Sequence, residues 1–243
     1  MILVIDIGNT SIKIAAVDNY QVLQHYRTDE QQLVATTKKL LGEFPEIKEA
    51  ALCQVGHFEN KILQELQKIV PVFIINQHVK LPFTNLYQSE SLGNDRIALV
   101  SGAIAQQQKD QAALIIDAGT CVTYDYIDSG NNYHGGAISP GLRLRYESLH
   151  NFTANLPLLT PQDTDEFIGN TTETSIHSGV VNGLSQEIKG CINQYKKKNK
   201  HINIFITGGD AQVLSTQLKS RFFATPFLML YGIYYLYHFN KEI

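Results

Sequence analysis

The feature that most constrains the fold is a weak internal repeat, in which a short apolar run ends in an Asp-x-Gly turn. Near the start, residues 2–5 lead into Asp6-Ile7-Gly8-Asn9-Thr10, and near the middle, residues 114–116 lead into Asp117-Ala118-Gly119-Thr120. Hydrophobic residues resume in alternation after each turn, which is typical of a β-hairpin. The repeat therefore predicts two similar halves, each opened by a hairpin.

Helical periodicity follows in both halves. Apolar residues recur at three- and four-residue steps from Ile97 to Ile104, and strictly every four residues from Ile176 to Ile192. Thr171 or Thr172 is placed to cap the start of the second helix. Strands mixed with long helices favour an α/β architecture. We place a domain boundary in the polar run near residue 110, which gives domains 1–110 and 111–243.

Composition excludes several classes of partner. With 44% hydrophobic residues, 18% charged residues and a net charge of -3, the chain has no basic surface of the kind that nucleic acid requires. The most apolar stretch, residues 227–239, is shorter than the ~18–20 residues of a membrane span, so we expect a buried or interface helix there. Three widely spaced cysteines suggest no disulfide framework, and the N-terminus does not resemble a signal peptide. We therefore expect a cytoplasmic protein without membrane or nucleic-acid partners.

The first turn carries several groups suited to binding phosphate. Its glycine lets backbone N–H groups come close to a ligand, and the Asn9 and Thr10 side chains can hydrogen-bond phosphate oxygens. Lys13 adds a positive charge, and the Asp6 carboxylate can hold a hydrated magnesium ion. A plain hairpin turn remains an alternative because Gly-Asn is common turn chemistry.

The second turn repeats this chemistry, although Asp117 to Thr120 alone is equally typical of a simple turn. Taken with the first copy, it indicates two phosphate-binding hairpins that clamp a nucleoside triphosphate across a cleft. A third glycine site, Thr207-Gly208-Gly209-Asp210, follows the strand-like run 202–206, and is either a nucleoside-binding turn or only a tight connection to a helix. No Gly-x-x-x-x-Gly-Lys-Ser/Thr motif is present, which excludes a P-loop enzyme.

Gly93-Asn94-Asp95-Arg96 begins an amphipathic helix. Asp95 can act as a general base toward a substrate hydroxyl, and Arg96 can neutralise a carboxylate or a transferring phosphoryl group. The alternative is structural, since an acidic residue in a first helical turn is favourable on dipole grounds alone. Further along, residues 135–141 (Gly-Gly-Ala-Ile-Ser-Pro-Gly) mark a tight loop, which either lines the cleft or only joins a strand to a helix.

Taken in order, these motifs resemble the type III pantothenate kinase family of the actin–hexokinase–Hsp70 superfold, over essentially the whole chain. The resemblance implies an α/β protein of two ribonuclease H-like (actin-like ATPase) domains, each a mixed sheet flanked by helices, with a cleft between them. It also implies ATP-dependent phosphorylation of pantothenate to 4'-phosphopantothenate, the first step of coenzyme A biosynthesis. The matching segments are residues 6–13, 93–96, 117–123, 135–141, 149–157, 168–172, 178–179 and 207–211.

The resemblance also implies roles for single residues. Asp95 becomes the catalytic base, Asp6 a magnesium ligand, and Asp117 a ligand of a monovalent cation, K⁺ or NH₄⁺. The family is similar in forming a homodimer, in which Thr172 reaches the pantothenate site of the partner subunit. Tyr87, six residues before Gly93 where the family usually has seven, would line the pantothenate pocket. The implied substrate-binding residues are Tyr87, Gly93, Asn94, Asp95, Arg96 and Thr172, and the implied ATP-binding residues are Asp6, Ile7, Gly8, Asn9, Thr10, Ser11, Ile12, Lys13 and Thr120.

Two other functions are compatible with the same superfold. One is an enzyme with a different substrate, such as a sugar or acid kinase or an exopolyphosphatase, because a fold does not fix its substrate. The Gly-x-Asp-Arg signature and the small size argue against it. The other is a non-catalytic regulatory protein, which would have no need of all three carboxylates Asp6, Asp95 and Asp117.

Overall fold

The computed structural model describes residues 1–56, 58–89, 91–162, 164, 166–211, 213, 214 and 223–241. Contacts divide the chain into two compact units. Unit 1 comprises Met1–Lys109, Asn131–Tyr133 and Phe227–Ile243, and unit 2 comprises Asp110–Gly130 and His134–Pro226. The sequence-based boundary near residue 110 assigned residues 227–243 to the second domain, whereas their contacts group them with unit 1.

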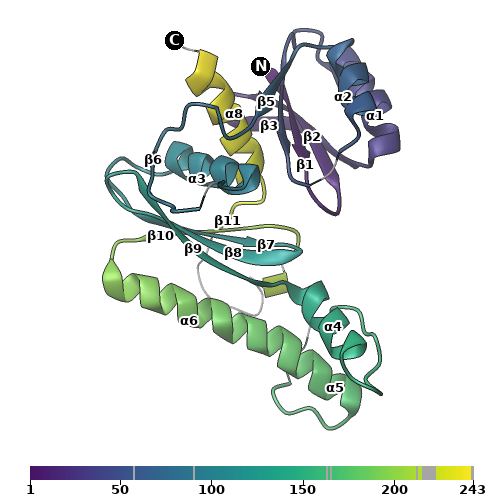
Figure 1. Cartoon of the computed structure of the whole chain (residues 1–243), viewed down its shortest axis with the longest axis vertical. Helices are drawn as coiled ribbons and strands as arrows, with labels where there is room; N and C mark the ends of the chain where they lie inside the picture. The colour runs from purple at the N-terminus through teal and green to yellow at the C-terminus, as the bar shows by residue number, and fades with distance from the viewer. Residues whose placement is uncertain are drawn as a thin grey trace. The chain divides into compact units, whose positions relative to one another are not determined.

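Unit 1 is built on a five-stranded sheet in the order β3-β2-β1-β4-β5 (Figure 1). The central strand β1 pairs antiparallel with β2 and parallel with β4, so the sheet is mixed. All six residues of β1 are buried, as expected of an apolar strand covered on both faces. The strands are β1 (Ile2–Ile7), β2 (Ile12–Asp18), β3 (Gln21–Thr28), β4 (Ala50–Gln54) and β5 (Val72–Ile75).

The helices of unit 1 cover this sheet. Leu33 and Leu40 of α1 join Leu66 of α2 and the strand residues in one hydrophobic core. Asp29 caps α1 by accepting the Gln32 N–H at 2.9 Å. On the other elements, α3 packs directly against α8. The helices are α1 (Glu30–Glu43), α2 (Asn60–Gln67), α3 (Asn94–Gln106) and α8 (Leu228–Lys241).

The predicted helix at residues 227–239 is confirmed as α8, and most of its apolar side chains are buried. It packs against α3, β1, β4 and β5, which explains why this late segment belongs to unit 1. Within the described part of the chain, no helix combines the length and the apolarity that crossing a membrane requires.

Two glycines set the close contact between α3 and α8. A Cβ atom on Gly232 would lie 1.7 Å from the Ala98 carbonyl oxygen, and one on Gly102 would lie 2.4 Å from the Leu228 carbonyl oxygen. Because these neighbours are backbone atoms, neither helix can yield without moving as a whole. We expect Gly232→Ala to lower the free energy of unfolding by about 3 kcal/mol, measured by urea denaturation.

The matched control for this substitution is Gly190→Ala in the middle of α6 (Gly183–Lys198). Gly190 is exposed, and a Cβ there would meet nothing within 4 Å. The same chemical change should therefore raise the free energy of unfolding by about 0.5–1 kcal/mol through helix propensity. Equal effects of the two substitutions would contradict the close-packing account of Gly232.

Unit 2 contains a second mixed sheet, with strand order β11-β10-β7-β8-β9. β7 pairs antiparallel with β8 and parallel with β10. The β1–β2 and β7–β8 pairs confirm the two predicted hairpins, and β10 confirms the predicted strand near residues 202–206. The strands are β7 (Ala113–Ala118), β8 (Cys121–Ile127), β9 (Asn132–Pro140), β10 (Asn203–Thr207) and β11 (Phe223–Ala224).

The helical segment of unit 2 is a continuous run that lies along one face of this sheet (Figure 1). It comprises α5 (Thr172–His177), a π-helical turn (Ser178–Asn182) and α6, and it follows the separate helix α4 (Leu142–Asn151). The predicted cap is confirmed at Thr171, whose hydroxyl accepts the Thr174 N–H at 3.1 Å.

The π-helical turn explains the strict four-residue repeat in the sequence. Four residues exceed the 3.6 of one α-helical turn, so in a regular helix such a stripe drifts around the axis. A π turn contains more residues per turn and rotates the stripe back toward the sheet. All five repeat positions lie in one buried core: Ile176, Val180, Leu184, Ile188 and Ile192.

Candidate active site

The turn between β1 and β2 forms the first part of the candidate site in unit 1. Asp6 and Lys13 pair across the hairpin, and the Lys13 Nζ lies 3.8 Å from an Asp6 carboxylate oxygen. The Gly8 N–H donates to the Ser11 carbonyl at 3.2 Å, which closes the turn. Ile7 and Ile12 are buried and anchor the turn on both sides, while its tip at Asn9 and Thr10 is exposed. The exposed tip can meet a ligand.

Asp6 is a buried carboxyl group, with 6% of its surface exposed. Burial raises its pKa to about 6, the negative charge of Asp95 adds to this, and the Lys13 ammonium opposes it. Burial and the charges of Asp6 and Asp95 likewise raise the pKa of the Cys53 thiol, on the neighbouring strand β4, well above its ordinary range. Asp6 and Asp95 therefore lie close enough to interact within unit 1.

Asp95 stands in the first turn of α3, and two local contacts fix its place. Its Oδ1 accepts the Arg96 backbone N–H at 2.8 Å, and a Cβ on Gly93 would lie only 2.4 Å from that oxygen. The Asn94 side chain donates to the Gln54 carbonyl at 3.2 Å. Since Gln54 pairs with Ile7, this bond ties the start of α3 to the strand end that carries Asp6.

Arg96 is buried beside two aromatic rings. Its Cζ lies 5.1 Å from the centre of the Tyr87 ring and 5.8 Å from that of the Tyr133 ring. The Tyr87 N–H donates to the Asn85 Oδ1 at 3.0 Å, which fixes the chain before the ring. The structure thus brings the predicted residues Tyr87 and Arg96 together. Sequence reasoning missed Tyr133, because a single tyrosine in a strand resembles any core residue.

In unit 2, Asp117 lies near the end of β7, where three glycine-containing turns meet. Thr207 pairs with Asp117, and the Asp210 N–H donates to the Ala118 carbonyl at 2.9 Å. Gly208 has φ +99°, and a Cβ there would lie 2.2 Å from the Ala118 carbonyl oxygen. Only glycine permits this left-handed conformation and close approach. The predicted third glycine turn is therefore packed against the second hairpin.

The loop before α4 closes the same region from the other side. The Gly141 N–H donates to the Thr120 carbonyl at 3.0 Å, and a Cβ on Gly141 would lie 2.0 Å from the Gly119 carbonyl oxygen. The loop at residues 135–141 thus contacts the predicted ATP-binding residue Thr120 directly.

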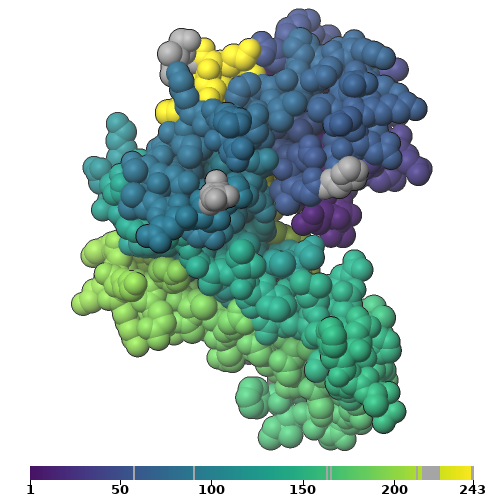
Figure 2. Space-filling view, viewed as in Figure 1, coloured from purple at the N-terminus to yellow at the C-terminus, as the bar shows by residue number. Residues whose placement is uncertain are grey.

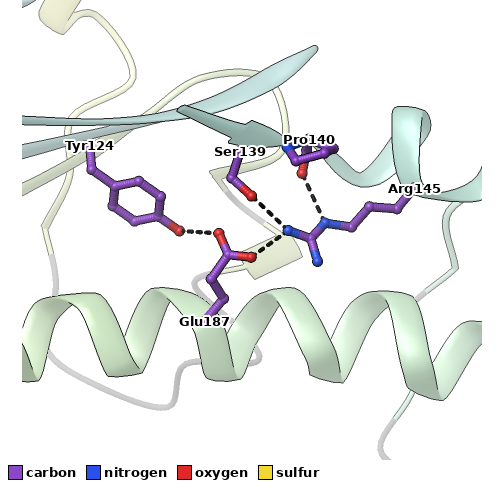
Figure 3. Close-up of polar contacts among 5 residues, drawn as sticks. All are labelled: Tyr124, Ser139, Pro140, Arg145 and Glu187. Carbon is purple, nitrogen blue, oxygen red and sulfur yellow. Dashed lines mark hydrogen bonds and ion pairs between the residues drawn. The ribbon is translucent and has the colours of Figure 1, made fainter. Parts of the chain in front are cut away.

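A polar network holds this loop to α6 (Figure 3). Arg145 donates to the Pro140 carbonyl and to the Ser139 hydroxyl, each at 2.8 Å, and pairs with Glu187. The Tyr124 hydroxyl donates to Glu187 at 2.9 Å. Burial opposes ionisation of Glu187, but the hydrogen bonds outweigh it and lower the pKa of this carboxyl group. Glu187 is therefore a charged anchor for the loop.

Thr172 lies elsewhere in unit 2, in a groove of about 970 Å³ between α4 and α5. Figure 2 shows both segments on the surface, in teal and green. The groove has apolar walls and a polar end formed by Asn170, Thr171 and Thr172. Its lining residues are Arg145, Ser148, Leu149, Leu156, Gly169, Asn170, Thr171, Thr172, Ser175, Ile176, Gly179 and Val180.

A sequence model described as type III pantothenate kinase matches residues 2–194. The chain belongs to the type III pantothenate kinase family. It is 42% identical over 243 residues to the type III pantothenate kinase of Flavobacterium johnsoniae, covering 100% of this chain and 99% of that one. It is 39% identical to a type III pantothenate kinase of Bacteroides fragilis, covering 99% of both chains.

Solved structures support the predicted fold. The chain is similar to a Campylobacter jejuni protein described as a Baf family transcriptional activator, with TM-score 0.67, 20% identity and 100% coverage of both chains. It is also similar to a glucokinase from an Antarctic psychrotroph, with TM-score 0.52, 13% identity and 98% coverage of both chains. At these identities the likeness shows the fold alone. The expected α/β fold of actin-like ATPases, with two mixed sheets flanked by helices, is confirmed.

Type III pantothenate kinases transfer phosphate from ATP to pantothenate in the first step of coenzyme A biosynthesis, and this type III pantothenate kinase is accordingly an enzyme. The predicted family and activity are confirmed. Neither a kinase for another substrate nor a silent regulatory protein is needed to explain the full-length identity to relatives that share one description.

Proposed function

We propose that Asp95 is the general base of the pantothenate kinase reaction and that Arg96 binds the pantothenate carboxylate. The observation that carries this assignment is the link between Asp95 and Asp6 in unit 1, made through the Asn94 bond to Gln54 and the mutual effect of the two carboxylates. A base beside the phosphate-binding turn is where a phosphoryl acceptor must be deprotonated. Gly93 and Asn94 would complete the substrate-binding segment.

The reaction uses these groups in a simple sequence. The terminal hydroxyl oxygen of pantothenate attacks the γ-phosphorus of ATP, and the bond from that phosphorus to the β–γ bridging oxygen breaks to release ADP. The hydroxyl proton passes to an Asp95 carboxylate oxygen. Since the transition state is loose and rich in charge, positioning and electrostatic stabilisation supply most of the catalysis. The turn at residues 6–13 would hold the phosphates through backbone N–H groups and the Lys13 ammonium, and Thr120 would contact them from unit 2.

The donor chemistry of the two Asp-x-Gly turns fits the expected cations. Magnesium is held by one or two carboxylates together with substrate phosphates, and Asp6 can serve as such a ligand. Asp117, with the nearby backbone carbonyls of Gly119 and Thr120, offers the oxygen ligands that a monovalent K⁺ or NH₄⁺ ion requires. Among the described residues, no three His, Cys, Asp or Glu side chains gather into a metal cluster, so bound phosphate must complete each shell. Both cations would offset triphosphate charge.

The groove containing Thr172 supports a homodimer. Phe152, Phe167 and Ile168 are 87%, 75% and 83% exposed near this groove in the sequence. Large apolar side chains exposed in this way are typical of an interaction surface. In the homodimer, Thr172 would reach the pantothenate site of the partner subunit. The three cysteines are free, which is consistent with the expected cytoplasmic location.

A coupled assay of ADP release tests this proposal. We expect release to require pantothenate and magnesium, and to fall about tenfold or more when K⁺ is replaced by Na⁺, since each 1.4 kcal/mol of lost transition-state stabilisation costs a factor of ten. Glucose and polyphosphate serve as control substrates. Turnover of either in place of pantothenate, or a monomer in sedimentation, would contradict the corresponding part of the proposal.

A further inference from the structure

Tyr133 is a fully buried tyrosine whose ring faces the Arg96 guanidinium. Its relative exposure is 0%, and the Arg96 Cζ lies 5.8 Å from the ring centre. The Tyr87 ring lies 5.1 Å from the same Cζ, and the two ring centres are 6.2 Å apart. A buried guanidinium between two aromatic rings is held by their negatively polarised faces.

The backbone and a third ring fix Tyr133 in this place. Its carbonyl accepts the Leu86 N–H at 2.9 Å, and it pairs in register with Asn85 of the short strand β6 (Thr84–Asn85). The Phe83 ring lies 5.7 Å from the Tyr133 ring. Because β6 also positions Tyr87 through the Asn85 side chain, one strand pair sets both rings. Tyr133 is thus a rigid support, whereas Tyr87 lies on a less buried segment.

Aromatic support suits a guanidinium that must bind a carboxylate. Bidentate recognition of a carboxylate uses the planar N–H donors of arginine. Contact with an aromatic face acts through charge and uses none of these donors. A ring can therefore hold the guanidinium in place without competing with a substrate.

We propose that Tyr133 is a positioning residue for pantothenate recognition, whose ring holds the Arg96 guanidinium in the orientation that meets the substrate carboxylate. This inference rests on the proposed role of Arg96. Tyr133 itself does not touch the reacting atoms, so its replacement should weaken recognition of the carboxylate while sparing ATP binding and the chemical step.

Steady-state kinetics of Tyr133→Leu and Tyr133→Phe test this role. In Tyr133→Leu, we expect the KM for pantothenate to rise roughly tenfold, with the KM for ATP changed less than about twofold. The preference for pantothenate over its neutral carboxamide, measured as a ratio of kcat/KM values, should fall by the same factor. Tyr133→Phe keeps the ring face and should restore both values to within about threefold of the wild type.

Phe83→Leu is the matched control, because it removes a buried ring that packs on Tyr133. An equal loss of carboxylate preference in Phe83→Leu would show that general packing is responsible and would overturn the inference. If Tyr133→Leu does not fold, trifluorophenylalanine at position 133 weakens the ring face at nearly unchanged volume. Unchanged preference relative to Tyr133→Phe would then overturn it. A wild-type enzyme that turns over pantothenate without preferring it to the carboxamide would overturn the Arg96 assignment, and this inference with it.

Discussion

Replacing Asp95 by asparagine is expected to lower kcat by about 10²–10⁴-fold, the range by which a positioned general base accelerates a reaction. Asparagine retains an oxygen that can accept the Arg96 N–H, which Asp95 Oδ1 accepts at 2.8 Å, so the start of α3 should keep its geometry. The substitution removes the proton acceptor and leaves the local backbone in place. Turnover measured with saturating ATP and pantothenate gives the loss, and circular dichroism confirms the fold.

Glu30→Gln is the matched control for Asp95→Asn. Glu30 also stands in the first turn of a helix, α1, where its charge interacts favourably with the helix dipole. If Asp95 served only that structural purpose, both substitutions would cost a few tenths of a kcal/mol of stability and leave kcat unchanged. Near-normal turnover by folded Asp95→Asn would therefore refute the assignment of the base.

Replacing Asp6 by asparagine is expected to abolish most activity while making the protein more stable at neutral pH. In the folded protein the pKa of Asp6 is raised from 3.8 to about 6, mainly by burial. Below pH 4 the carboxyl is protonated in both the folded and the unfolded state and costs nothing. As the pH rises above 6, the folded protein must hold a buried negative charge, which lowers the free energy of unfolding by about 3 kcal/mol.

Urea unfolding at pH 8 and pH 4 separates these effects. Asp6→Asn should gain about 1–3 kcal/mol over the wild type at pH 8, reduced in part because Lys13 loses its partner, and almost nothing at pH 4. The exposed N-cap Asp29 provides a control, because asparagine caps a helix about as well and Asp29→Asn should change stability little. Activity should fall at least about a hundredfold only in Asp6→Asn. A loss of stability in Asp6→Asn at pH 8 would contradict the buried-charge account.

Much of the fold could be predicted from the sequence because its signals are local. The apolar runs before Asp6 and Asp117 indicate the two hairpins, and a hydroxyl at Thr171 marks a helix start. The order of motifs was enough to identify the family. The candidate site was predicted as a set of residues, and the structure brings Asp6, Lys13, Asp95, Arg96 and Tyr87 together within unit 1.

What could not be predicted depends on contacts between distant parts of the sequence. Residues 227–243 join unit 1 because Gly232 lets α8 approach α3, and no local pattern encodes that partner. The support of Arg96 by Tyr133 depends on a strand pair between β6 and β9, of which β6 has only two residues. The π-helical turn also lies beyond a periodicity argument, which recognises a stripe but assumes uniform turns.

The return of α8 to unit 1 has a consequence for biosynthesis. A ribosome delivers the segments of unit 1 first and last, with the residues of unit 2 between them. Unit 1 therefore emerges without the helix that covers α3, and its apolar surface stays open to chaperones until translation passes α8. Unit 2, whose elements emerge without interruption from β10 back to β7, can collapse earlier. Nascent chains stalled before residue 228 should accordingly carry a protease-sensitive first unit beside a protected second one.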